Sequence, residues 1–192
     1  MGTESLNDKL ARLNMEHVDI TPYSPEWPMQ FEKEREFLTN ILPGSIVRRI
    51  EHFGSTAVPG LAAKPIIDIL VEVSNLEDTK LHIVPILEAQ NYEYLWRPTI
   101  GNSPPYYAWF IKRDSNGNRS HHIHMVEADS ELWDRLLFRD YLRQFPEEAE
   151  RYNELKQMLS KEHPEDRTAY TVGKSDYVVA TTKKAIRYFA KN

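Results

Sequence analysis

The stretch EHFGSTAVPGLAAKPIIDILVEV, residues 51–73, indicates the class of fold, because it joins two predicted strands through a glycine turn. The segment SIVRRIEHF (45–53) predicts the first strand, and PIIDILVEV (65–73) predicts the second. The second segment is β-branched and almost wholly apolar, which is typical of a central strand covered on both faces. One carboxylate, Asp68, interrupts it. The stretch therefore predicts a sheet whose central strand carries a single acid.

Asp68 and the turn before it form the first candidate site. Gly54 lets the backbone approach a ligand closely, and Ser55 adds a hydroxyl beside free N–H groups that favour anions. A carboxylate within an apolar strand is costly to bury unless it is paired, hydrogen-bonded or bound to a metal. Lys64 lies between the turn and Asp68, where it would neutralise the acid or a ligand phosphate. The alternative is structural: Asp68 accepts hydrogen bonds from the turn or pairs with Lys64 or an arginine.

The rest of the chain predicts a mixed sheet followed by helices. An apolar stripe predicts a helix over 24–42 with Ser24 as its N-cap. Residues 106–127 predict a hairpin around Asn116-Gly117, a pair preferred in type I′ turns. The other predicted elements are a leader helix over 4–15, a brief strand over 18–20, a helix over 77–90, a strand over 91–96 and helices after Asp129. We predict an α+β fold with a mixed β-sheet core flanked by helices and a helical C-terminal third.

Composition narrows the class of protein. Of the 192 residues, 41% are apolar and 28% are charged, a balance that fits a globular chain with its own core. We divide the chain into a leader over 1–16 and a single domain over 17–192. The net charge of −5 gives no general basic field for nucleic acid, and no apolar run approaches the roughly 20 residues of a membrane span. The absence of cysteine excludes disulfides, thiol catalysis and cysteine-based zinc sites. We expect a cytoplasmic protein without a nucleic-acid or membrane partner, and leave the oligomeric state open.

Histidines in the hairpin form the second candidate site. In SHHIHMVE, His122 and His124 share one face of the predicted strand, and such a pair can ligate one metal. If this strand lies beside the Asp68 strand, Asp68, His122 and His124 form a three-ligand site for a divalent metal such as Mg, Mn or Zn, with His52 as a fourth candidate. The alternative is that these histidines only form hydrogen bonds in a polar cleft or contact a ligand phosphate.

Three segments together resemble the GrpB-like proteins of the nucleotidyltransferase superfamily. They are HFGSTAVPGLAAKPIIDI (52–69), the HIH at 122–124 and LFRDYLRQFPEEAERYNELK (137–156). The resemblance covers roughly residues 17–190 and implies the nucleotidyltransferase-like sheet core. In the superfamily, a Gly-Gly or Gly-Ser turn precedes Asp-x-Asp or Asp-x-Glu on the next strand, and a third acid follows on a later strand.

Only part of that superfamily pattern is present. Gly54, Ser55 and Asp68 match it, but Leu70 stands where the second acid belongs. A two-metal mechanism needs several carboxylates around two cations about 4 Å apart. Glu72 lies on the same face as Asp68 but roughly 13 Å along the strand, so it does not replace the missing acid. We therefore expect any chemistry to depend on Asp68, His122 and His124, the residues we predict to be catalytic.

Basic and hydroxyl side chains supply the predicted phosphate contacts. Arg139 and Arg143 share a helix face, and their guanidinium forks suit phosphate. Lys174 lies at a predicted helix start, in a Gly-Lys-Ser run without the spacing of a P-loop. The alternative is a solvated network in which both arginines pair with nearby acids. The predicted ligand-binding set is His52, Gly54, Ser55, Thr56, Lys64, Arg139, Arg143 and Lys174.

Three functions compete on these residues. The first is a nucleotidyltransferase that binds an NTP and a divalent metal and transfers a nucleotidyl group to a small acceptor. The second is a catalytically degenerate protein that binds a nucleotide or a related phosphate ligand in the same pocket, as the missing acid at Leu70 suggests. The third is a metal-dependent hydrolase that uses the His/Asp set. All three predict a small-molecule phosphate ligand, and whether the protein is an enzyme stays open.

Overall fold

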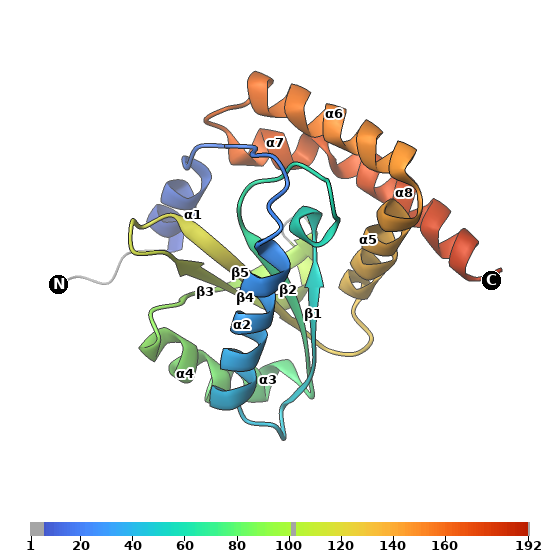
Figure 1. The fold of residues 1–192 in the computed structure, drawn as a ribbon. Helices are drawn as coiled ribbons and strands as arrows, with labels where there is room; N and C mark the ends of the chain where they lie inside the picture. The colour runs from blue at the N-terminus through green and yellow to red at the C-terminus, as the bar shows by residue number, and fades with distance from the viewer. Residues whose placement is uncertain (1–5, 101–102, 192) are drawn as a thin grey trace.

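The computed structural model describes residues 6–100 and 103–191, which form one mixed five-stranded sheet with helices packed against it (Figure 1). The strands are β1 (Val47–Phe53), β2 (Ile67–Val73), β3 (Glu93–Ile100), β4 (Ser103–Arg113) and β5 (Arg119–Val126). Their order in the sheet is β1-β2-β5-β4-β3. β2 pairs in parallel with β5, and the other neighbouring strands are antiparallel. The predicted α+β fold is confirmed, and the strand that carries Asp68 lies inside the sheet.

Helices precede, interrupt and follow the strands. Before β1 come α1 (Leu6–Asn14) and α2 (Trp27–Ile41), and a 3₁₀ turn (Ser55–Ala57) follows it. After β2 come α3 (Leu76–Asp78), a π-helical turn (Thr79–Ile83) and α4 (Val84–Ala89), which occupy the predicted helix over 77–90. A second 3₁₀ turn (Glu131–Trp133) leads into α5 (Asp134–Gln144), α6 (Pro146–Glu162), α7 (Arg167–Gly173) and α8 (Ser175–Phe189). Within the described ranges, no helix combines the length and the apolar character that a bilayer span requires.

Side chains alternate along β2 between two faces of the sheet. Ile67, Ile69 and Val71 are fully buried and join the apolar cluster that includes residues of α2 and α4. Asp68 and Leu70 point to the opposite face, where Leu70 is fully buried in a second cluster with residues of α1, β4 and α5. Because apolar side chains cover both faces, β2 reads as an almost continuous apolar run. Asp68 is the exception that the fold has to accommodate.

The loop between β1 and β2 packs under the C-terminal helices. Val58 and Leu61 share an apolar cluster with Phe138 of α5 and Tyr152 of α6. Figure 1 shows α5 to α8 gathered along one side of the sheet, and the loop after β1 lies against them. The helical C-terminal third therefore fixes the loop that begins at Gly54.

A buried lysine joins α6 to the same loop. The Nζ of Lys156 donates a hydrogen bond to the carbonyl of Ala62, and the side chain is almost fully buried. Burial lowers the pKa of Lys156 to about 7. Between that value and the ordinary pKa of 10.5, the unfolded chain binds more protons than the folded chain, so this residue makes stability rise with pH.

We predict that the free energy of unfolding of the wild type rises relative to that of Lys156→Met between pH 7 and pH 9. The expected slope of the difference is at most about 1.4 kcal/mol per pH unit, because one pKa unit corresponds to that energy. Paired urea unfolding curves at three pH values measure it. A difference that does not change with pH would contradict the burial of a neutral lysine.

The leader predicted over 1–16 lies partly outside the described residues, which begin at residue 6. Its described part, α1, packs on the sheet: Leu13 is 3% exposed within the second apolar cluster. Lys9 Nζ donates a hydrogen bond to the carbonyl of Tyr94 on β3, at 2.9 Å. In the structure α1 is therefore packed against the same sheet as the rest of the chain.

The hairpin predicted over 106–127 forms between β4 and β5, but the predicted turn type is wrong. A type I′ turn needs a positive φ at both central residues, and Gly117 has a φ of 83° whereas Asn116 does not have a positive φ. The carboxylate of Asp114 accepts hydrogen bonds from the backbone N–H groups of Asn116 and Asn118, each at 2.9 Å. These bonds favour a longer loop in which only Gly117 is left-handed.

Two further predictions near the N-terminus fail. The segment 18–20 forms no strand; its neighbour Thr21 makes an isolated bridge to Ala63 instead. The second predicted helix begins at Trp27, so Ser24 is not its N-cap. The Oγ of Ser24 accepts a hydrogen bond from the N–H of Glu26 at 3.2 Å and closes the turn before the helix.

Candidate metal and phosphate site

Asp68, His122 and His124 lie together because β2 and β5 are parallel neighbours. The register pairs Asp68 with His122 and Leu70 with His124. The two histidines are two residues apart on β5, so both point to the face that carries Asp68. The neighbouring strands that the three-ligand prediction required are therefore present.

The donor atoms of these three residues are close enough to share an ion. His122 Nδ1 lies 3.2 Å from Asp68 Oδ1, and His124 Nε2 lies 4.0 Å from the same oxygen. One donor atom from each residue lies within 4.8 Å of the others. Ligands about 2.0–2.2 Å from a zinc-like ion are about 3–4 Å from one another. The arrangement fits a single metal after small side-chain movements.

The protonation states favour a cation. Burial lowers the pKa of His122 to about 4 and that of His124 to about 3, so both imidazoles are neutral at pH 7. Burial raises the pKa of Asp68, but the hydrogen bond to His122 and nearby positive charges lower it by more, so the net shift is downward. Two neutral imidazoles and an ionised carboxylate are the forms that bind a metal.

Tyr107 fixes the orientation of one imidazole. Its hydroxyl lies 3.2 Å from His124 Nδ1, and the two rings stack with centroids 5.4 Å apart. The other ring nitrogen, His124 Nε2, is buried and has no hydrogen-bond partner among the residues that the structure describes. A partner that holds one nitrogen and directs the other toward the site is a common second layer around metal-ligating histidine.

Gly54 gives the Asp68 carboxylate its space. Its φ of 73° lies in the left-handed region, and a Cβ added there would sit 2.5 Å from Asp68 Oδ2 and 3.1 Å from Asp68 Cγ. Glycine is thus required at this turn by both its backbone conformation and its contact with the acid. The glycine turn noted in the sequence packs directly against the candidate metal ligand.

Leu70 closes off the two-metal arrangement. It is fully buried in the second apolar cluster, beside the His124 strand. The donor set is therefore one carboxylate and two imidazoles. Nitrogen donors suit zinc, manganese or iron, whereas magnesium prefers oxygen ligands in an octahedron.

Two lysines approach this site from distant parts of the chain. Lys64 lies in the loop before β2, and Lys174 lies between α7 and α8. Their Nζ atoms lie 5.0 Å and 4.3 Å from the ring centroid of Tyr170. Burial lowers the pKa of both, to about 8 for Lys174, and their mutual repulsion adds to the effect on Lys64. In the described part of the chain, neither Nζ has a carboxylate oxygen within 4.0 Å, and the more distant charge of Asp68 acts on both and raises their pKa values against the effect of burial.

Two arginines near the same end of the site already have a counter-ion. Arg119 and Arg167 both pair with Glu16, at 2.6 Å and 2.9 Å. Arg119 also approaches His122 Nε2, at 3.5 Å. The charge of Glu16 therefore neutralises part of the positive charge here, whereas the described residues place no carboxylate within 4.0 Å of either lysine.

Several residues of the site were not predicted from sequence. They are Glu16, Arg97, Tyr107, Arg119, Arg135 and Arg167, whose side chains contact the triad or contribute to its electrostatic environment. Among these residues, only Tyr107 stood in a local sequence pattern that could have indicated it, because it shares a strand with other aromatic residues of the predicted hairpin. The others come from five separate segments, and no local spacing connects them.

The remaining residues of the predicted turn have internal partners. His52 stacks on Phe31 on the opposite face of β1, with ring centroids 4.8 Å apart, so the structure does not bring it to the triad. His52 Nε2 and Thr56 Oγ1 are 3.0 Å apart, and Thr56 donates to the carbonyl of Ile66. Ser55 begins the 3₁₀ turn and lies near Tyr152 of α6. These contacts tie the turn to β2 and to α6.

Arg139 and Arg143 hold the backbone of the same loop. Arg139 Nη1 donates to the carbonyl of His52 at 2.7 Å, and its Nε pairs with Asp140 at 2.7 Å. Arg143 donates through Nε and Nη2 to the carbonyl of Ala57, at 2.9 Å and 2.7 Å. Phosphate contacts by these two side chains stay a prediction, because in the structure their guanidinium groups are engaged with the loop.

We predict that Arg139→Gln lowers the free energy of unfolding by about 1–3 kcal/mol, because it leaves the buried carbonyl of His52 without its charged donor. Arg151→Gln is the matched control: its pair with Glu148 is also an ion pair, but the Arg151 side chain is 62% exposed. We expect Arg151→Gln to lower the free energy of unfolding by less than about 1 kcal/mol. Urea denaturation measures both, and equal losses would count against a clamping role for Arg139.

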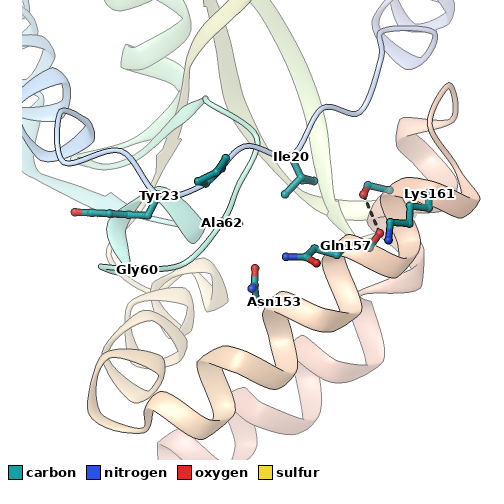
Figure 2. A pocket seen from close by; sticks show the side chains of 9 residues that line it. Ile20, Tyr23, Gly60, Ala62, Asn153, Gln157 and Lys161 are labelled. Carbon is teal, nitrogen blue, oxygen red and sulfur yellow. Dashed lines mark hydrogen bonds between the residues drawn. The ribbon is translucent and has the colours of Figure 1, made fainter.

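A cavity of about 460 Å³ lies elsewhere, between the loops at residues 20–23 and 60–62 and the helix α6. Figure 2 shows Asn153, Gln157 and Lys161 on the helix side, facing Ile20, Tyr23, Gly60 and Ala62. The residues that line this cavity include none of the triad. It is therefore separate from the metal and phosphate site.

Comparison with known proteins identifies the family. The GrpB protein family matches residues 17–184, so the chain belongs to the GrpB family. A relative from Pseudomonas aeruginosa, the UPF0157 protein PA4798, is 37% identical over 174 residues, which are 89% of this chain and 69% of that protein. The crystal structure of the conserved protein GrpB from Enterococcus faecalis is similar at 36% identity and a TM-score of 0.76, covering 89% of this chain and 99% of that one. The resemblance of the sequence to the GrpB-like proteins is confirmed.

More distant structures include the Cid1 poly(U) polymerase. Its similarity to this chain has a TM-score of 0.49 at 13% identity, over 74% of this chain and 44% of that one.

Proposed function

We propose that this GrpB-family protein binds a nucleotide or a related phosphate ester at a one-metal centre formed by Asp68, His122 and His124. One observation carries the proposal: an ionised carboxylate and two neutral imidazoles converge near two lysines that have no carboxylate within 4.0 Å among the described residues. A metal site alone explains the triad, and an anion site alone explains the lysines. Both together fit a metal-bound phosphate ligand.

Each element of the chain has a separate role in this proposal. Asp68 and the two histidines hold the metal, which when bound supplies charge neutralisation and polarises a phosphoryl oxygen. Lys64 and Lys174 hold phosphate oxygens, and the backbone at Gly54 keeps the carboxylate in place. The two nitrogen donors favour manganese or zinc over magnesium.

The reaction that follows binding is the open part of the proposal. Nucleotidyl transfer to a small acceptor is the activity expected of a nucleotidyltransferase relative, although Leu70 removes a carboxylate that a second metal would need. A phosphoester hydrolase is a second candidate, because catalytic zinc sites also use three protein ligands and an open fourth position. A protein that binds the ligand without turnover is the third outcome.

Labelled ATP separates these outcomes. We expect ATP to bind in the presence of manganese or zinc, and the double change Lys64→Gln/Lys174→Gln to weaken it at least about tenfold, because hydrogen bonds to charged groups contribute about 1.5–3 kcal/mol each. Label recovered on an added acceptor indicates transfer, label released as phosphate indicates hydrolysis, and retained ATP indicates binding alone.

Lys33→Gln/Lys183→Gln is the matched control, since both lysines are exposed and the change in net charge is the same. Its affinity for ATP should equal that of the wild type. ATP binding that needs no metal, or that the Lys64/Lys174 change leaves intact, would refute the proposal.

A further inference from the structure

We infer that the site also has a second anion subsite, centred on the guanidinium of Arg97, that binds a small carboxylate- or phosphate-bearing molecule. This inference deepens the proposed function and rests on it, since it assigns a second ligand to the same site. It is carried by the position of Arg97, its support by aromatic rings and the lack of a counter-ion.

The two groups of cations lie at different ends of the triad. Lys64 precedes the first residue of β2, whereas Arg97 lies on the far edge strand β3 and pairs in register with Tyr107. Because β2 and β5 are parallel, His124 lies farther toward the carboxyl ends of these strands than His122. The lysines therefore approach the triad from the amino end, and Arg97 approaches from the other end and from across the sheet.

Arg97 is held in place by aromatic side chains. Its guanidinium lies 4.6 Å from the ring centroid of Trp109 and 6.0 Å from that of Tyr107. Both rings are buried, and Trp109 contacts His122 edge-on with centroids 5.0 Å apart. Stacking fixes the plane of a guanidinium while its N–H groups at the edge stay available, which suits a planar carboxylate or a phosphate.

Arg97 and Arg135 lack the counter-ions that other arginines near the site have. Glu16 neutralises Arg119 and Arg167, as described above. For Arg97 and Arg135, no carboxylate lies within 4.0 Å in the described ranges, and both side chains are exposed. Positive side chains therefore lie toward both ends of the triad, and a single phosphate group held at the lysines would leave Arg97 without a counter-ion.

Tungstate, an oxyanion with the shape of phosphate, tests the subsite in crystals of the full chain. We expect two anomalous peaks, one at Lys64 and Lys174 and one at Arg97. Arg97→Gln should remove the second peak and leave the first, with at least a tenfold loss of occupancy. Arg187→Gln, an exposed change of equal charge on α8, should keep both.

Two results would overturn the inference: no peak at Arg97 in the wild type, or a peak there that survives Arg97→Gln. Lys64→Gln/Lys174→Gln reports on the proposed function separately. If that variant keeps the Arg97 peak and loses the other, both statements hold. If the wild type shows the Arg97 peak and none at the lysines, the proposed phosphate contacts fail while the second subsite stands. Competition by excess succinate that removes only the Arg97 peak identifies a carboxylate ligand, and its persistence identifies a phosphate.

Discussion

Asp68→Asn is expected to lower the affinity of the protein for manganese or zinc by about 100-fold or more. The substitution keeps the size of the side chain but removes the only carboxylate of the triad, and changes in the outer shell of a metal site alone cost about 10–100-fold. Titration of the metal-free protein with each ion, followed by calorimetry, measures the effect. We expect His124→Gln to reduce affinity as well, because it removes one of the two nitrogen donors.

Glu72→Gln is the control for this prediction. Glu72 lies on the same strand and the same face as Asp68, so the charge change and the strand are matched. Its carboxylate is not part of the group of donors that meet at Asp68. Metal affinity within about twofold of the wild type is expected, and a loss as large as that of Asp68→Asn would show that general negative charge, not ligation, holds the ion.

Gly54→Ala is expected to have the second large effect, on both stability and metal binding. With a φ of 73° and a ψ of −172°, Gly54 lies in a backbone region that essentially only glycine adopts, and another residue there costs on the order of 1–3 kcal/mol. The new methyl group would also overlap the Asp68 carboxylate, since the nearest oxygen is 2.5 Å away and the Cβ and Cγ of Asp68 are 3.1 Å away. The acid has to move, so we predict a loss of metal affinity of about tenfold or more in addition to the loss of stability.

Gly60→Ala separates the two contributions. Gly60 also has a left-handed φ, of 81°, but no atom lies within 4 Å of the position of an added Cβ. It should show the backbone cost of roughly 1–2 kcal/mol and normal metal affinity. Denaturation and metal titration of the two variants give the comparison. If both variants bind metal normally, the contact between Gly54 and Asp68 does not position the ligand.

The sequence predicted the parts of the site that lie within one strand or one turn. The glycine turn, the isolated acid and the alternation of His122 and His124 are local patterns, and period-two alternation placed each side chain on the correct face. The sequence did not show whether the Asp68 strand pairs with the histidine strand, because the two strands are more than 50 residues apart. The structure shows that β2 and β5 are parallel neighbours.

The positions of site residues that tertiary packing brings together could not be predicted from the sequence. Lys174 lies near Asp68 because α7 and α8 pack against the loop at residues 54–64, and Arg97 lies on β3, which β4 separates from the strand of His122 and His124. Arg139 shows the opposite case: a guanidinium beside a glycine turn suggests phosphate, but a loop carbonyl occupies it. The predicted turn type was wrong for a local reason. The Asp114 carboxylate accepts hydrogen bonds from the loop backbone, and these bonds stabilise a longer loop than the type I′ turn that Asn116-Gly117 favours.

Leu70 affects which class of metal the site is expected to bind. A leucine at this position extends the apolar cluster under α1 and α5, so restoring an acid there would bury an unpaired charge. His124, which pairs in register with Leu70, contributes a nitrogen donor to the site in place of a second carboxylate. The centre is therefore expected to prefer a different class of metal from the oxygen-ligated magnesium pair.

Metal analysis of protein purified without a histidine tag shows whether Asp68, His122 and His124 hold an ion. After exposure to manganese and zinc and removal of the excess, we predict one ion per chain, with an anomalous diffraction peak about 2.0–2.2 Å from donor atoms of Asp68, His122 and His124. A protein that retains no stoichiometric metal, or a peak located away from these three side chains, would contradict the account.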